Sequence, residues 1–250
     1  MTGSSGTPTF LSLQRMRILY ESHLRDGSDY RSHGPKLDEK WKSISGLPHP
    51  EGCAITRRSI QDAWRRADST ESARNALFET LIWGYGNDRH GPKKFDRIRF
   101  ALDRSSGLLG ELIKIRDTAQ RQPVEAFRTL IALEITEVKF VYATKVIYAM
   151  GANAPVLDQH IEKWLGQFGE SMSPIKSAHQ QRQTRRVEIY KEHLAWFHSM
   201  SEAHLNNEIG AVSDIALVEY MMFWDSKSEN FRARKQQPKW LKGVPRWSDS

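Results

Sequence analysis

The chain has 250 residues, of which 39% are hydrophobic, 27% charged and 10% aromatic, and its formal net charge is +7. This aromatic content, with eight tryptophans, is typical of a folded globular protein and excludes a chain that is disordered throughout. A single cysteine, Cys53, excludes an intrachain disulfide framework and a four-cysteine zinc or iron–sulfur site. No apolar run approaches the roughly 18 residues of a membrane span, and residues 1–9 lack the apolar core of a secretory signal. We therefore expect a cytoplasmic protein without a membrane partner.

Helical periodicity dominates the chain from residue 10 onward. Residues 26–54 are rich in Gly, Pro, Ser and His and predict a long irregular connection, and one of residues 68–70 is expected to cap the helix that follows. Prolines at 92 and 123 predict helix starts, and glycines at 84, 86 and 151 predict helix ends. The predicted helices cover residues 10–19, 55–67, 70–83, 92–102, 107–119, 123–133, 140–150, 158–164, 187–200 and 209–224.

The pattern contains no alternating strands, no βαβ rhythm and no repeat at solenoid spacing. We therefore predict an all-α fold of about ten helices. The expected organisation is a disordered N-terminus at residues 1–9, a helical domain at 10–226, and a basic, Trp-containing C-terminal tail at 227–250 that orders on a ligand or against the domain.

Basic residues gather in several clusters, a distribution that suits an anionic partner. One cluster taken singly is more often a solvated helix face, but several with aromatics between them favour a surface that contacts phosphates. The clusters are Arg57, Arg58, Arg65 and Arg66; Arg89, Lys93, Lys94, Arg97 and Arg99; Arg182, Arg185, Arg186 and Lys191; and the tail from Lys227 to Arg246.

Several common chemistries are absent from the sequence. There is no phosphate-binding Gly-x-x-x-x-Gly-Lys-Ser/Thr loop, no complete dinucleotide fingerprint, no metalloprotease His/Glu pattern and no Gly-x-Ser-x-Gly elbow. His193 and His198 are five positions apart and lie on different faces of a helix, which disfavours a shared metal. We expect no metal and no cofactor.

Residues 137–158 combine an apolar helix, a Gly/Pro loop and an acid that opens the next helix. Lys139 and Lys145 interrupt the apolar run, and a buried ammonium must be paired, snorkelling or partly deprotonated. A neutral amine is a nucleophile for carbon centres, and Asp158 at a helix N-cap can stabilise positive charge. The residues alone favour a simpler interpretation, in which the lysines snorkel and Asp158 only caps a helix.

A family resemblance changes that balance. Thr136–Lys139, the apolar helix 140–150, Pro155–His160 and Trp164 together resemble the helix-hairpin-helix DNA glycosylases, most closely the 8-oxoguanine group, over about residues 123–168. In that group a lysine at the start of the hairpin's second helix attacks the sugar C1′, and an aspartate at the next helix start assists. The resemblance assigns these roles to Lys139 and Asp158, which are 19 positions apart.

Two features depart from the family pattern. The hairpin turn would fall at Ile135–Glu137, where both glycines of the usual Gly-hydrophobic-Gly turn are missing, and Glu137 is less favourable beside a DNA phosphate. Lys145 is the alternative nucleophile, but it lies six positions after Lys139, about 240° around a helix, so the two amines are not expected to face one site.

The resemblance implies a monomeric enzyme that flips a damaged or modified base, 8-oxoguanine by family analogy, out of double-stranded DNA and excises it through a lysine Schiff base with AP-lyase activity. Trp83 and Tyr85 are the candidate base-pocket residues, although Trp83 as ordinary core is the stronger interpretation. The candidate DNA contacts are Arg89, His90, Lys93, Lys94, Arg185 and Arg186. Three alternatives stay open: a glycosylase that removes bulky bases of bacteriophage DNA in defence, a non-catalytic nucleic-acid-binding protein, and a protein–protein adaptor that uses the tail.

Overall fold

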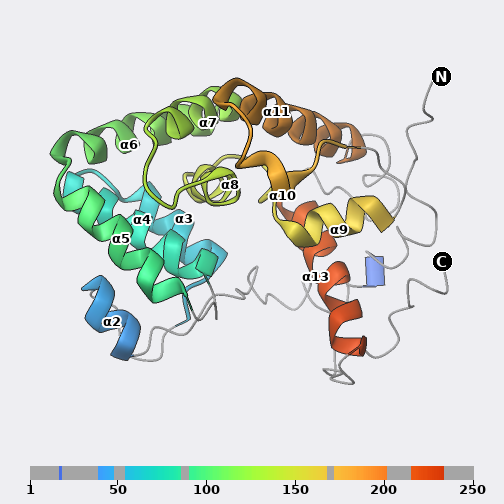
Figure 1. The fold of residues 1–250 in the computed structure, drawn as a ribbon, viewed down its shortest axis with the longest axis horizontal. Helices are drawn as coiled ribbons and strands as arrows, with labels where there is room; N and C mark the ends of the chain where they lie inside the picture. Colours follow the sequence, from blue (N-terminus) through green and yellow to red (C-terminus); the bar gives the residue numbers. More distant parts are fainter. Residues whose placement is uncertain are drawn as a thin grey trace. The chain divides into compact units, whose positions relative to one another are not determined.

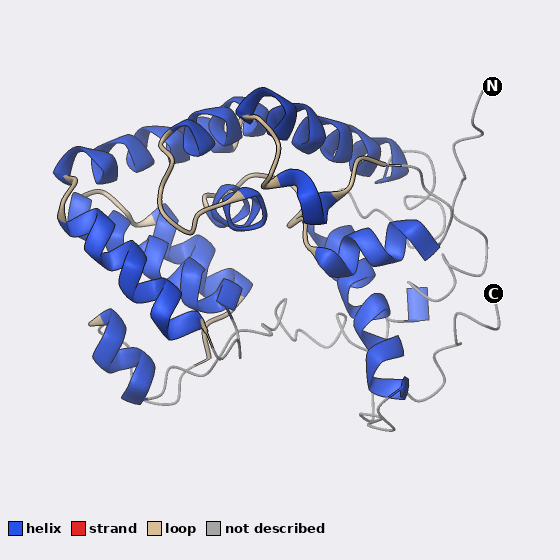
Figure 2. Ribbon diagram, viewed as in Figure 1, coloured by secondary structure: helices blue, strands red, loops and turns tan. Residues whose placement is uncertain are grey.

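The computed structural model describes residues 17–18, 39–47, 54–85, 90–167, 172–201 and 215–233. Within these residues the regular secondary structure consists of eleven α-helices and no β-strand (Figures 1 and 2). The all-α prediction is therefore confirmed for this part of the chain. The helices are α2 (Glu39–Ser45), α3 (Arg57–Arg65), α4 (Thr70–Tyr85), α5 (Gly91–Asp103), α6 (Ser106–Ala119), α7 (Pro123–Ala132), α8 (Phe140–Ala149), α9 (Gln159–Gln167), α10 (Ile175–Ala178), α11 (Gln183–Met200) and α13 (Ile215–Ala233).

Helix starts follow the local signals of the sequence. The prolines at 92 and 123 occupy the first turn of α5 and α7, where a missing N–H costs no hydrogen bond. Thr56 caps α3 and exchanges hydrogen bonds with Ser59 in a capping box. Ser69 caps α4, because its Oγ accepts a hydrogen bond from the backbone N–H of Ser72 at 3.2 Å.

The prediction of an irregular connection at residues 26–54 is wrong for α2. This helix is too short to be stable alone, and it forms because Trp41 is buried and packs edge-to-face on Phe95 of α5, with ring centroids 5.9 Å apart. At the other end, α13 continues to Ala233, beyond the boundary at Ser226 that composition suggested. The predicted helix at 10–19, except for Arg17 and Ile18, lies outside the described residues, as do residues 234–250.

The chain divides into two compact units. The central unit comprises residues 29–154 and 179–187, and the terminal unit comprises residues 1–28, 155–178 and 188–250.

Helix α4 forms the core of the central unit, where it packs against α3, α5, α6 and α8. Ten of its sixteen residues are buried, on all sides of the helix, as expected for an element surrounded by others. Trp64 of α3 donates its indole N–H to Thr80 Oγ1 at 3.0 Å, and the ring of Phe78 packs at a tilt against Phe95 of α5 with centroids 4.6 Å apart. Apolar packing and one buried polar contact therefore hold α3 and α5 to α4.

Helices α7 and α8 pack against each other and are joined by residues 133–139. Phe127 and Phe140 meet edge-to-face with centroids 5.5 Å apart. The connection contains two non-glycine residues with left-handed backbone, Glu134 at φ 48° and Glu137 at φ 65°. Such a conformation costs roughly 1–2 kcal/mol for a residue with a Cβ. The Glu137 carboxylate pairs with Arg97 of α5 at 3.1 Å.

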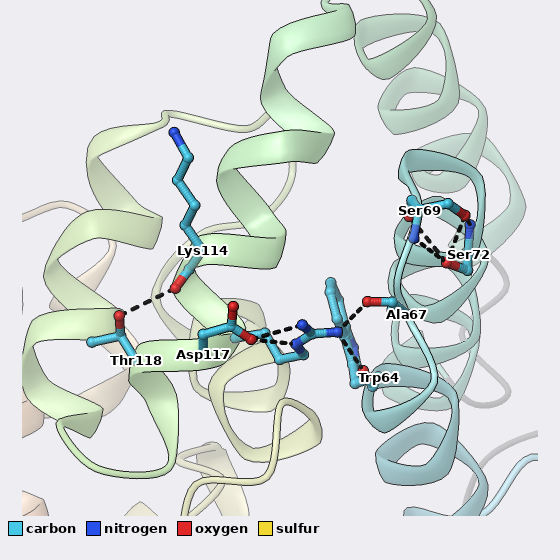
Figure 3. Close-up of polar contacts among 8 residues, drawn as sticks. Trp64, Ala67, Ser69, Ser72, Lys114, Asp117 and Thr118 are labelled. Atoms are coloured by element: carbon cyan, nitrogen blue, oxygen red, sulfur yellow. Dashed lines mark hydrogen bonds and ion pairs between the residues drawn. The ribbon is translucent and has the colours of Figure 1, made fainter.

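The C-terminal end of α3 is held by an arginine from α6. Arg116 Nη1 donates to the carbonyl oxygens of Trp64, at 3.3 Å, and of Ala67, and Arg116 Nη2 pairs with Asp117 at 2.7 Å. In Figure 3, dashed lines join the guanidinium to Asp117 on one side and to the Trp64 and Ala67 carbonyl groups on the other, and the Ser69–Ser72 cap that begins α4 is also drawn. A cation at this position satisfies carbonyl groups that the end of a helix leaves without intrahelical partners.

In the terminal unit, α9 packs against α13 and α10. The indole N–H of Trp164 donates to Asp225 Oδ2 at 3.0 Å, and both side chains are fully buried. Ser173 holds the side chain of Glu192 of α11 through its backbone N–H at 2.9 Å and its hydroxyl at 2.6 Å. These polar contacts, one buried and one half-buried, fix the partners of α9 and α11 more specifically than apolar packing alone.

Candidate active site

Lys139 is the N-cap residue of α8. Its backbone is extended, at φ −83° and ψ −175°, and its carbonyl accepts the first hydrogen bond of the helix from Ala143 N–H at 2.8 Å. The lysine side chain is exposed, whereas the next residue, Phe140, is fully buried. Lys139 therefore lies at the start of a largely buried helix, whose first backbone N–H groups have no partner within the helix.

Lys145 lies in the interior of the central unit and is 7% exposed. Its ammonium donates to the carbonyl of Gly84 at 3.2 Å, near the C-terminal end of α4, and lies 5.4 Å from the ring centroids of both Trp83 and Tyr142. Gly84 leaves room for this side chain, because a Cβ there would approach Lys145 Cδ and Tyr142 Cε1 to 3.0 Å. Burial of the amine is thus offset by a carbonyl and two ring faces.

Trp83 and Tyr85 are also buried, at 1% and 4% exposure. Two cations lie over the Trp83 ring, with Arg57 and Lys145 each 5.4 Å from its centroid, and the Tyr85 ring packs on Tyr142 with centroids 4.7 Å apart. Both aromatics belong to the core of the central unit. Their role as base-pocket residues stays a prediction.

Arg57 corrects one interpretation of the charge pattern. The sequence groups it with a basic surface cluster, but its side chain is fully buried and its guanidinium lies 5.0 Å from the centroid of Tyr148 and 5.4 Å from that of Trp83. Helix α3, whose sequence suggests a basic face exposed to solvent, therefore buries Arg57, and the two aromatic rings beside its guanidinium contribute favourable cation–π energy.

Asp158 is the N-cap of α9, as the sequence predicts. Its Oδ1 accepts hydrogen bonds from the backbone N–H groups of His160 at 2.8 Å and Ile161 at 3.3 Å. The carboxylate thus lies at the positive end of the α9 dipole.

Lys227 of α13 is the charged neighbour of Asp158 in the terminal unit. Burial lowers the pKa of the Lys227 ammonium, and the charge of Asp158 raises it in part. The ammonium lies 5.3 Å and 4.9 Å from the ring centroids of Phe223 and Trp224, one helical turn before it. Sequence reasoning missed this residue, because it placed Lys227 in a polar tail. The aromatic pair at the i−4 and i−3 positions was the available signal.

Two contacts near Asp158 join α9 to α13. The ring of His160 meets that of Phe223 edge-to-face at 4.8 Å, and its Nδ1 lies 3.4 Å from Ser226 Oγ. Together with the Trp164–Asp225 hydrogen bond, they hold the N-terminal turn of α9 against the segment of α13 that carries Lys227.

The comparison with protein families decides what kind of protein this is. The family described as "Putative 8-oxoguanine DNA glycosylase OGG-like protein" matches residues 26–223. The chain belongs to this OGG-like family. The substrate that this family description implies is DNA. No curated protein and no solved structure matches the chain significantly.

The candidate DNA contacts of this OGG-like protein differ in exposure. His90, Lys93 and Arg185 are exposed, whereas Lys94 and Arg186 are half-buried. The ammonium of Lys94 lies 5.7 Å from the Tyr85 ring centroid, and the Arg186 guanidinium donates to the carbonyls of Gln181 and His179, at 2.8 Å each. Arg89 lies outside the described residues.

Two features of the described residues bear on other classes of function. No helix among the described residues is long and apolar enough to cross a membrane. Among the same residues, no group of three or more His, Cys, Asp and Glu side chains is placed to hold a metal ion.

Proposed function

We propose that this OGG-like protein is a DNA glycosylase that extrudes a damaged or modified base from duplex DNA and cleaves the bond between base and sugar. Membership of the family supports a DNA substrate. The observation that carries the proposal is the place of Lys139, an exposed lysine at the N-cap position of a largely buried helix. Asp158 caps α9 and follows at the separation expected of the family's lysine and aspartate.

In the proposed reaction the target nucleotide is first flipped, because its C1′ is inaccessible inside the base stack. The amine of Lys139 attacks C1′, the N-glycosidic bond breaks, and the base leaves with the bonding electron pair and takes up the proton that the amine gives up. Asp158 stabilises the positive charge that develops on the sugar. The lysine–C1′ adduct then opens to a Schiff base, from which β-elimination nicks the strand. If Asp158 instead orients a water molecule, the base is released without a nick.

The surroundings of Lys145 favour Lys139 as the nucleophile. The ammonium of Lys145 donates to the Gly84 carbonyl and is packed against two rings, so an attack on C1′ would first require that contact to break. Lys139 is exposed, so its amine can reach C1′ without first leaving the protein interior. We assign Lys145 a structural role at the end of α4.

The helix pair α7 and α8, with the connection at residues 133–139, is proposed to act as the helix-hairpin-helix of this protein. The left-handed backbone of Glu137 supports this, since the residue occupies the place of the second turn glycine and adopts a conformation that glycine favours. The ion pair of Glu137 with Arg97 offsets the carboxylate that would otherwise repel a DNA phosphate. Further phosphate contacts are proposed for His90, Lys93, Lys94, Arg185 and Arg186.

Borohydride trapping tests the proposal. A duplex that carries 8-oxoguanine is incubated with the protein and sodium borohydride, which reduces a Schiff base to a stable covalent adduct. We expect an adduct that is lost in Lys139→Ala and kept in Lys145→Met, provided that circular dichroism shows both variants folded. Asp158→Asn keeps an N-cap acceptor but removes the charge, and it should slow base release by 10-fold or more, since each 1.4 kcal/mol of lost transition-state stabilisation is tenfold in rate.

The alternatives predict different results in the same assay. Base release without an adduct would support the water route. The assay is repeated with duplexes that carry a panel of bulky modified bases. If the protein binds every duplex but releases no base and forms no adduct, it is a non-catalytic DNA-binding protein and the proposal is overturned.

A further inference from the structure

A hollow of about 790 Å³ lies in the central unit, where the C-terminal ends of α3 and α8 meet the end of α6. It has no part in the proposed base excision. Helix α8 separates it from Lys139, since ten residues at 1.5 Å per residue place the two ends of that helix roughly 15 Å apart. The lining includes Gln61, Arg65, Arg116, Gln120, Arg121 and Gly151.

The carbonyl groups at this place are already engaged by side chains of the lining. Arg116 donates to the carbonyls of Trp64 and Ala67 at the end of α3, and Gln61 Nε2 donates to the carbonyl of Tyr148 near the end of α8, at 3.5 Å. The negative ends of these helices are thereby partly neutralised.

Cations dominate the charge of the lining. Three guanidinium groups face one carboxylate, and that carboxylate, Asp117, binds Arg116 through Nε at 2.9 Å and Nη2 at 2.7 Å. Arg65 pairs with Asp62 through one nitrogen, and its side chain remains 71% exposed. Arg121 is exposed and forms no ion pair within the part of the chain that the structure describes. The donors that remain available belong to Arg65 and Arg121.

Gly151 also lines the hollow, directly after α8. Gly151 has φ +96°, and a Cβ there would lie 2.9 Å from Gln120 Nε2. The glycine therefore lets the amide of Gln120 rest directly on the backbone after α8, which places a further N–H donor in the lining.

We propose that this hollow binds a phosphate group. Arg65 and Arg121 would contact its oxygens through their forked N–H donors, and Arg116 would supply a fixed positive charge behind them. Guanidinium matches phosphate in geometry and charge. The phosphate belongs either to a DNA strand, as a second anchor remote from the proposed nucleophile, or to a free nucleotide.

The test compares Arg65→Gln/Arg121→Gln with Lys114→Gln/Arg128→Gln in the full chain. The second variant is a matched control, because it also removes two positive charges from exposed side chains of the central unit, and Lys114 and Arg128, like Arg65, pair with an acid three residues earlier. Binding of an undamaged duplex is measured by fluorescence anisotropy at several salt concentrations, and the melting temperature is measured with and without AMP or inorganic phosphate.

If a DNA strand supplies the phosphate, Arg65→Gln/Arg121→Gln binds the duplex roughly tenfold more weakly than the control, and the slope of log K against log salt falls by about 1–2. If a free nucleotide supplies it, AMP raises the melting temperature of the control but not that of Arg65→Gln/Arg121→Gln. Equal behaviour of the two variants with every probe would overturn the assignment. Undamaged DNA keeps this test separate from base excision, which is judged by trapping alone.

Discussion

Replacing Arg116 with methionine removes the guanidinium that holds the end of α3 but keeps most of the aliphatic volume. The wild-type side chain donates to the carbonyl oxygens of Trp64 and Ala67 and pairs with Asp117. The arginine is 19% exposed and Asp117 is 60% exposed, so the carbonyl contacts are more sheltered from water than the ion pair.

The magnitude follows from these contacts. A hydrogen bond from a charged donor contributes about 1.5–3 kcal/mol. Two carbonyls share Nη1, so we count the two contacts as one such bond. The ion pair with the exposed Asp117 adds about 0–1 kcal/mol, because solvent screens it. Arg116→Met should therefore lower the free energy of unfolding by about 2–4 kcal/mol. Arg116→Lys keeps a charge without the fork and should cost about half of that.

The assay is urea unfolding followed by tryptophan fluorescence, which reports on Trp64 and Trp83 in the central unit. Arg128→Met is the control, since that arginine makes only a surface pair with Glu125 and should cost about 0.5 kcal/mol or less. If Arg116→Met and Arg128→Met shift the urea midpoint equally, the carbonyl contacts do not stabilise α3 and the reasoning fails.

Three further results are expected. Gly151→Ala should lower the free energy of unfolding, measured in urea, more than Gly46→Ala does. Both glycines have a left-handed φ, so each substitution costs roughly 1–2 kcal/mol of backbone strain, but only the Cβ at residue 151 also forces a neighbouring side chain to move. Equal losses for the two variants would contradict this reasoning. Burial lowers the pKa of His193 below its usual value, so the unfolded chain binds a proton at a higher pH than the folded protein does, and stability should fall as the pH drops through about 6.5. His193→Gln should reduce this dependence of stability on pH between about 7.5 and 5.5. An unchanged dependence in the variant would refute the role of His193. Trp164→Phe removes an indole donor to the buried Asp225 carboxylate and should cost about 2–4 kcal/mol by the same measurement, whereas a loss under 1 kcal/mol would show that the contact is not important.

The features that local chemistry controls were predictable. Pro92 and Pro123 begin helices, and Asp158 caps α9, because each effect acts within one helical turn. The opposite exposures of Lys139 and Lys145 also follow from helical geometry, since six residues turn the second lysine to the other side of α8.

Features that depend on distant residues were not predictable in this way. The carbonyl of Gly84 holds Lys145 across 61 positions, Arg57 enters the core rather than the surface because Trp83 and Tyr148 offer ring faces there, and α2 forms because Trp41 finds Phe95. Lys227 acquires its neighbour Asp158 only when α13 packs on α9. Hydrogen bonds within one helical turn depend on residues that are close in the sequence, so the sequence alone predicted most of the helices and the Asp158 cap. Burial and charge pairing join segments far apart along the chain, so packing alone settled which cations lie in the core and which remain available to an anionic ligand.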